Sequence, residues 1–185
     1  EHGNHIFAFQ KMLHRVIYPK LSNSDTVDLT VHFRCGDAPF DRTLSNGFLK
    51  NAYYIDAVEI LYVSKVKHVK ILHCFNHWDP TDHNLSYDTV SKIVPKYVTH
   101  MRLLMEKLCP LARVEVVCSS IDDDFAMMIY SPKFIGSTSS MSRIASLIRK
   151  DLCVCPEPNP LFFRQGTQKL PEHINELSHE KYVLK

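Results

Sequence analysis

The feature that most constrains the fold is an alternation of apolar, β-branched runs with helical patterns. Apolar, strand-like runs occur around Val31 and at residues 69–75, 114–118, 133–136 and 152–155. Between them, helical patterns cover residues 49–63, 93–108, 122–130 and 141–149. Strands that alternate with helices predict an α/β fold, in which a parallel sheet carries helices on both faces.

Length and charge limit what such a chain can be. The 185 residues, 45% of them hydrophobic, suffice for one domain with a core and hardly for two. We expect this domain over residues 1–160, with a helix at residues 6–16, and a tail over 161–185 that packs on it or is flexible. A formal charge of +2 predicts no nucleic-acid-binding surface. No apolar run approaches the ~20 residues of a membrane helix.

The first stretch with candidate chemistry is Asp28–Phe40, where a buried strand ends in polar residues. Because side chains alternate along a strand, His32 and Arg34 are expected on one face. Ligands of open α/β sheets bind at the C-terminal ends of strands, and an arginine there is a bidentate clamp for phosphate. The alternative interpretation is a strand end whose arginine pairs with a nearby carboxylate.

The second stretch is Phe134–Arg143, in which a strand ends, Gly136 allows a tight turn, and hydroxyl residues precede a helix. A helix N-terminus offers unpaired N–H groups and a positive dipole end, which suit a phosphate or diphosphate. The stretch lacks the lysine of a P-loop and the glycine pattern of a dinucleotide fold. The alternative interpretation is an ordinary serine-rich N-cap.

The candidate metal ligands of this sequence are acidic residues and cysteines. The run Asp122–Asp124 fits a metal site for a diphosphate, a contact to a purine or ribose, or a solvated first helical turn. None of the six cysteines has zinc-site spacing, so we predict no metal site. Cys74, Cys118 and Cys153 lie in apolar runs, where cysteine is usually a small buried hydrophobe.

Together, these stretches resemble motifs of the GDP-fucose-using fucosyltransferases of the α1,2, α1,6 and protein-O type. Those enzymes have a GT-B fold with a Rossmann-like nucleotide lobe. Their first motif, a strand ending His-x-Arg-Arg-x-Asp or Arg-Arg-Gly-Asp, is similar to His32-Phe-Arg-Cys-Gly-Asp37. Their later motif, an acidic residue on a short helix, a strand and a serine-rich turn, is similar to Asp124–Ser140. The resemblance covers roughly residues 27–155.

The resemblance implies roles for individual residues. Arg34 would hold the donor diphosphate, and His32 and Asp124 would contact the guanine. Phosphate would also bind the start of the helix through Ser137, Thr138, Ser139 and Ser140. The reaction would be an inverting, metal-independent transfer of a sugar, fucose from GDP-fucose, to a glycan or other hydroxyl acceptor, with no further cofactor. Asp37 and Asp41 are the nearest candidates for the catalytic base.

The sequence also departs from the family pattern. Cys35 stands where a second arginine is common, and it faces either the phosphate or the core. The length leaves no room for the second lobe of a GT-B enzyme, so we expect one lobe of a longer protein or a minimal acceptor lobe. Two alternatives stay open: an inactive nucleotide-sugar-binding module, and a metal-dependent transferase using Asp122 and Asp124. The compartment would be the Golgi or endoplasmic reticulum lumen for a eukaryotic secretory enzyme, and the cytoplasm otherwise.

Overall fold

The computed structural model describes residues 27–35, 49–73, 87–149, 151–156 and 167–168. These residues form a six-stranded sheet in which every pair of neighbouring strands is parallel. The strands are β1 (Leu29–His32), β2 (His68–Leu72), β3 (Arg113–Val117), β4 (Lys133–Ile135), β5 (Leu152–Val154) and β6 (Thr167–Gln168). Their order across the sheet is β3-β2-β1-β4-β5-β6, which is the order of a Rossmann-like fold.

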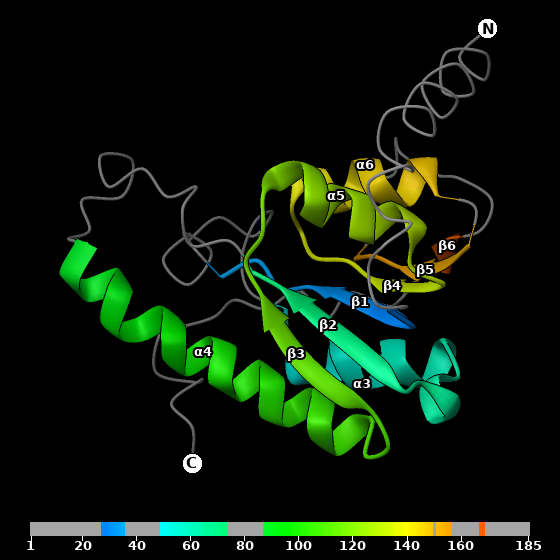
Figure 1. Cartoon of the computed structure of the whole chain (residues 1–185), viewed down its shortest axis with the longest axis horizontal. Helices are drawn as coiled ribbons and strands as arrows, with labels where there is room; N and C mark the ends of the chain where they lie inside the picture. The colour runs from blue at the N-terminus through cyan, green and yellow to red at the C-terminus, as the bar shows by residue number, and fades with distance from the viewer. Residues whose placement is uncertain (1–26, 36–48, 74–86, 150, 157–166, 169–185) are drawn as a thin grey trace, which may run out of the picture.

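Helices follow the strands in alternation and cover both faces of the sheet (Figure 1). They are α3 (Asn51–Ile60), α4 (Tyr87–Leu108), α5 (Ile121–Tyr130) and α6 (Ser140–Ile148), with a short 3-10 turn, η1 (Val63–Lys65). In Figure 1, α5 and α6 lie on one side of the sheet and α3 and α4 on the other. The predicted α/β class, parallel sheet and two helical layers are therefore confirmed.

The observed elements differ from the predicted ones mainly at their ends. α4 begins at Tyr87, before its apolar periodicity starts, and includes Pro95. β6 was not predicted, because a two-residue strand carries no alternation that a pattern can detect. The helix expected at residues 6–16 lies outside the described residues, as does almost all of the expected tail.

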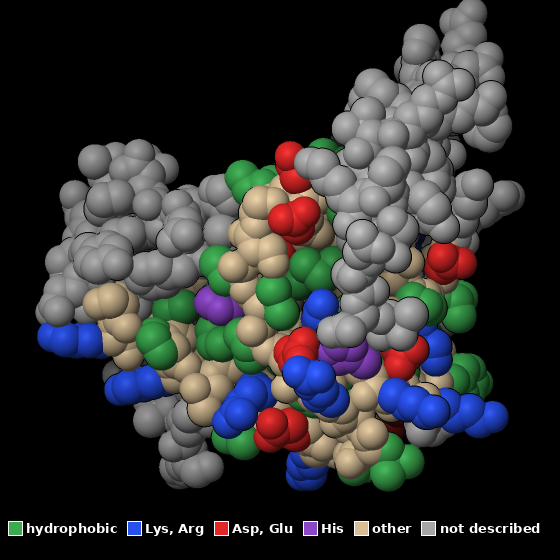
Figure 2. Space-filling view, in the orientation of Figure 1, with side chains coloured by type: hydrophobic (Ala, Val, Ile, Leu, Met, Phe, Trp, Pro, Cys, Tyr) green, Lys and Arg blue, Asp and Glu red, His purple; other side chains and the backbone are tan. Residues whose placement is uncertain are grey.

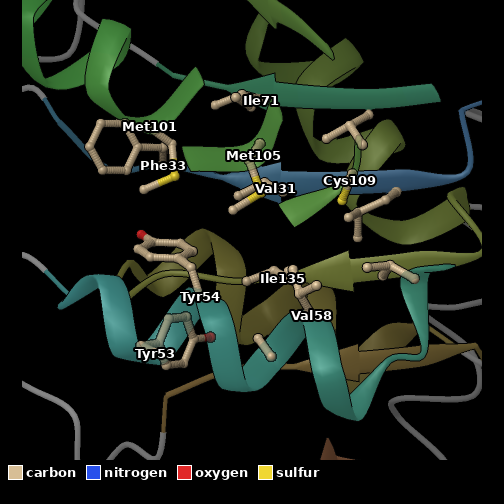
Figure 3. Close-up of a cluster of buried hydrophobic side chains, with 14 of the residues drawn as sticks. Val31, Phe33, Tyr53, Tyr54, Val58, Ile71, Met101, Met105, Cys109 and Ile135 are labelled. Carbon is tan, nitrogen blue, oxygen red and sulfur yellow. The ribbon is translucent and has the colours of Figure 1, made fainter. Parts of the chain in front are cut away.

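Two clusters of buried side chains form the core, one on each face of the sheet. On the α3 and α4 side, the ring of Phe33, directly after β1, packs edge-on against Tyr54, and Val31, Met101 and Met105 belong to the same cluster (Figure 3). The second cluster draws its members mainly from α5, α6, β4 and β5, including Met128, Phe134, Ala145 and Cys153. The alternate residues of β1 therefore point toward α5 and α6.

This alternation determines the orientation of Cys35. Its side chain has no solvent exposure and belongs to the α3 and α4 cluster, together with Leu29, Val31 and Phe33. Of the two orientations considered for Cys35, the structure shows the one that faces the core. The expectation that Cys118 is buried is wrong, because it follows the end of β3 and is exposed, whereas Cys153 is buried as expected.

Arg149, directly after α6, is a buried arginine that serves the packing of the domain. Its guanidinium group donates hydrogen bonds to the carbonyls of Met128, Ser131 and Leu152. It also lies over the ring of Phe134, 5.3 Å from the ring centroid. Arg149 thereby ties the end of α5 to the start of β5, so its charge is used for structure.

Charged side chains of both signs lie on the described surface. On the face shown in Figure 2, basic and acidic side chains are interspersed over the described elements. Within the described ranges, none of the helices combines the length and the apolar character needed to cross a membrane.

Candidate functional site

The candidate site lies where the direction of sheet winding changes, between β1 and β4. From β1 the chain continues to β2 on one side, and from β4 it continues to β5 on the other side. The register pairs Val31 with Ile135, so the polar ends of both strands lie at the same edge of the sheet. Ligands of open α/β sheets bind outside the carboxyl ends of the strands at such a switch point.

Three serine hydroxyls surround one nitrogen of His32: those of Ser137 and Ser139 in the turn after β4, and that of Ser142 in the first turn of α6. The Nδ1 atom lies 2.6 Å from the Oγ of Ser142, 3.2 Å from that of Ser137 and 3.4 Å from that of Ser139. The structure therefore joins the two predicted stretches through direct side-chain contacts. Ser142 was not predicted as a site residue, although it lies only two residues beyond Ser140, the last of the predicted hydroxyl residues.

Each of these hydroxyls also accepts a hydrogen bond from a backbone N–H group of the same turn. The Oγ of Ser142 accepts from the N–H of Ser137 at 2.9 Å, and the Oγ of Ser137 accepts from the N–H of Ser139 at 3.3 Å. The Oγ of Ser139 accepts from the N–H of Ser142 at 3.1 Å and is the N-cap of α6. The N-cap interpretation therefore holds for Ser139, and the hydroxyls of this turn are used within the protein.

His32 is uncharged at neutral pH because of its surroundings. It is buried, and burial together with the positive charge of Arg34 lowers its pKa to about 4. Arg34 follows His32 by two residues in extended backbone, so the two side chains are expected on one face, where the positive charge of Arg34 disfavours a charged imidazole. Arg34 itself is half-buried, so the site combines a neutral donor or acceptor with a permanent cation.

Tyr53 of α3 supports the turn from the opposite face of the sheet. Its hydroxyl lies 2.8 Å from the carbonyl oxygen of Gly136 and 3.2 Å from that of Val154, and it donates to them. Burial raises the pKa of Tyr53 well above its usual value, so the hydroxyl keeps its proton. No local pattern marks Tyr53 as a site residue, because its partners lie 83 and 101 residues further along the chain.

Gly136 is required by close packing. A Cβ atom added there would lie 2.3 Å from the Sγ of Cys155, 3.2 Å from the Cβ of Ser142 and 3.3 Å from the ring of Phe134. A contact of 2.3 Å is impossible without movement of the neighbouring groups. The glycine predicted from turn geometry is therefore needed because Cys155, directly after β5, and Ser142 of helix α6 approach the backbone here.

We expect Gly136→Ala to lower the melting temperature clearly. Overpacking of a well-packed site costs about 1–3 kcal/mol, and here the methyl group meets both Cys155 and Ser142. Thermal unfolding followed by circular dichroism measures the effect. Ser140→Ala is the matched control, because Ser140 is exposed in the same turn and should unfold like the wild type. A Gly136→Ala protein as stable as that control would show that the turn has spare room.

The other predicted site residues occupy different environments. Asp124 is buried in the first turn of α5, whereas Asp122 and Asp123 are exposed. The solvated-turn interpretation thus fits the first two carboxylates only. Thr138 is buried and Ser140 is exposed.

The remaining expectations concern the base and a metal. Asp37 and Asp41, the candidate bases, lie outside the described residues. In the part of the chain that the structure describes, no group of three His, Cys, Asp or Glu side chains gathers at one point where it would hold a metal ion.

Comparison of the sequence with models of protein families and with curated proteins gives no match.

Proposed function

We propose that this chain is the nucleotide-sugar-binding lobe of a glycosyltransferase, which transfers fucose from GDP-fucose to a hydroxyl acceptor with inversion. The observation that carries the proposal is the meeting, at one switch point, of the arginine-bearing end of β1 with the serine turn that begins α6. Both halves suit a diphosphate, and their position is where open α/β sheets bind ligands.

The hydrogen bonds of the turn refine how the diphosphate would bind. The N–H groups of Ser139, Ser142 and Arg143 are bonded within the turn. Those of Ser140 and Met141 have no acceptor among the described residues and are the ones available to an anion. The exposed hydroxyl of Ser140 adds a donor for the diphosphate. The hydroxyls of Ser137, Ser139 and Ser142 instead contact the imidazole of His32.

In this mechanism, the residues at the switch point stabilise the leaving group. A base, Asp37 or Asp41, removes the proton of the acceptor hydroxyl, whose oxygen attacks the anomeric carbon of the sugar as the bond to the diphosphate breaks. Arg34 and the start of α6 stabilise the negative charge that develops on the diphosphate, in place of a metal ion. His32 and the buried Asp124 contact the guanine.

Thermal unfolding in the presence of GDP, UDP and CMP tests the proposal. A ligand that binds only the folded state adds about 2.7 kcal/mol of stability at a hundredfold excess over Kd. We expect GDP to raise the melting temperature, UDP and CMP to leave it unchanged, and a chelator to have no effect on the GDP shift. Absence of a shift with GDP would contradict the proposal. A shift that vanished in chelator and returned with manganese would favour a metal site at Asp122 and Asp124.

A second candidate function is a nucleotide-sugar-binding module without activity. The burial of Cys35 in the core favours it, because the second arginine of the family motif then has no counterpart on the site face of β1. An assay for GDP released from GDP-fucose, with and without hydroxyl acceptors, separates the two functions. Release supports the transferase, and GDP binding without release supports the module.

A further inference from the structure

We propose that Ser142 is a positioning residue, which with Ser137 and Ser139 holds His32 as the tautomer that carries its proton on Nε2. The switch point then presents a fixed hydrogen-bond donor beside the charge of Arg34. This inference rests on the proposed function only for the identity of the ligand. The position of the proton follows from the hydrogen bonds of the turn alone.

The proton assignment follows from counting donors and acceptors. A hydroxyl carries one proton to donate, and each of the three hydroxyls already accepts from a backbone N–H group. The unprotonated Nδ1 has one lone pair, and the Oγ of Ser142, at 2.6 Å, is better placed to donate to it than the hydroxyls of Ser137 and Ser139, at 3.2 and 3.4 Å. The Oγ of Ser137 also lies 3.3 Å from that of Ser142, so Ser137 can donate its proton to Ser142. If Nδ1 carried the proton instead, Ser142 would accept it and donate to Ser137, whose own proton would then have no acceptor among these described side chains. An unprotonated Nδ1 therefore satisfies the turn best, and the proton of a neutral imidazole must then lie on Nε2.

Ser142 is the main determinant among the three serines. Its contact with Nδ1 is the shortest, and its side chain has no solvent exposure, so it acts on a ligand only through His32. It also accepts from the N–H of Ser137, and in this way it couples the imidazole to the backbone of the turn. Removing this hydroxyl removes both contacts at once.

The charges around the imidazole agree with a neutral ring. Arg34 lies on the same strand, and its positive charge together with burial lowers the pKa of His32. The turn before α6 contributes hydroxyls, and within the described residues no carboxylate is hydrogen-bonded to the ring. A carboxylate or carbonyl at Nδ1 commonly fixes the opposite tautomer, so the serines make His32 a donor on its other side.

A fixed Nε2–H donor selects the ligand atom that faces it. It stabilises a carbonyl oxygen, such as O6 of guanine, and disfavours an amino group, such as N6 of adenine. In the proposed nucleotide site, Ser142 would thus contribute to a preference for GDP over ADP without touching either.

Nitrogen-15 NMR of the imidazole groups in the full chain reads the tautomer directly. In the wild-type protein at pH 7, we expect His32 to show a protonated Nε2 and an unprotonated Nδ1. As the pH is lowered, the nitrogen-15 chemical shifts of His32 should remain those of a neutral imidazole until the pH approaches the pKa of about 4. A proton found on Nδ1 at pH 7 would overturn the proposal, and this measurement needs neither a variant nor a ligand.

Ser142→Ala tests the positioning role, with Ser146→Ala as the control. Ser146 lies one turn further along α6, and its hydroxyl donates to the carbonyl of Arg143. We expect a mixture of tautomers in Ser142→Ala and a loss of roughly five- to tenfold in the preference for GDP over ADP, the size of one neutral hydrogen bond. Ser146→Ala should match the wild type. An unchanged tautomer in folded Ser142→Ala would overturn the proposal.

The two measurements also separate this inference from the proposed function. A wild-type protein that shows the Nε2–H tautomer but binds no GDP supports the positioning role and contradicts the nucleotide site. If Ser142→Ala does not fold, the wild-type spectrum still decides where the proton lies.

Discussion

The Cys35→Arg protein is expected to lose most of its stability. Cys35 has no solvent exposure and packs in the cluster between the sheet and helices α3 and α4. A buried charge without its partner typically costs about 3–5 kcal/mol, which is a large part of the ~5–15 kcal/mol that stabilises an ordinary domain. We therefore expect a collapsed melting temperature, measured by thermal unfolding, although the family motif commonly has arginine at this position.

Two controls separate the charge from other effects of this substitution. Cys35→Ala removes the thiol without adding a charge and should cost much less. Cys118→Arg adds the same side chain at an exposed cysteine and should leave the melting temperature unchanged. A stable Cys35→Arg protein that bound GDP more tightly than the wild type would contradict the prediction, because the side chain would then face the diphosphate.

Arg34→Ala is expected to abolish GDP binding and to leave the protein folded. Arg34 is half-buried at the switch point, and its charge already acts on the neighbouring His32. Truncating one partner of a buried, charge-assisted pair costs about 2–5 kcal/mol of binding free energy. The lower limit corresponds to a Kd roughly thirtyfold higher, which isothermal titration calorimetry with GDP resolves easily.

The control for charge is Arg102→Ala, which removes an exposed arginine of α4 that pairs with Glu106. It should bind GDP like the wild type. Arg34→Ala should also raise the pKa of His32, since the positive charge that lowers it is gone, and NMR titration measures this without a ligand. Wild-type GDP affinity in Arg34→Ala would make Arg34 a structural residue and would contradict the proposed site.

Much of the architecture was predictable because it depends on local patterns. The alternation of apolar strands with helical periodicity predicted five of the strands and the helices α3 to α6, with differences mainly at their ends. The two-residue period of a strand also placed His32 and Arg34 on one face. Such patterns arise from the geometry of single elements, so a short stretch of chain contains all the information they need.

Contacts between elements were not predictable in the same way. The sequence alone determined an α/β domain with a parallel sheet and polar residues at two strand ends. Only the tertiary structure showed that β4 lies beside β1, that Ser142 contacts His32 from 110 residues away, and that Tyr53 holds the turn. It also showed that Gly136 is needed because the side chains of Cys155 and Ser142 approach it. The physical reason is that these contacts depend on the order of strands across the sheet, which no local periodicity encodes.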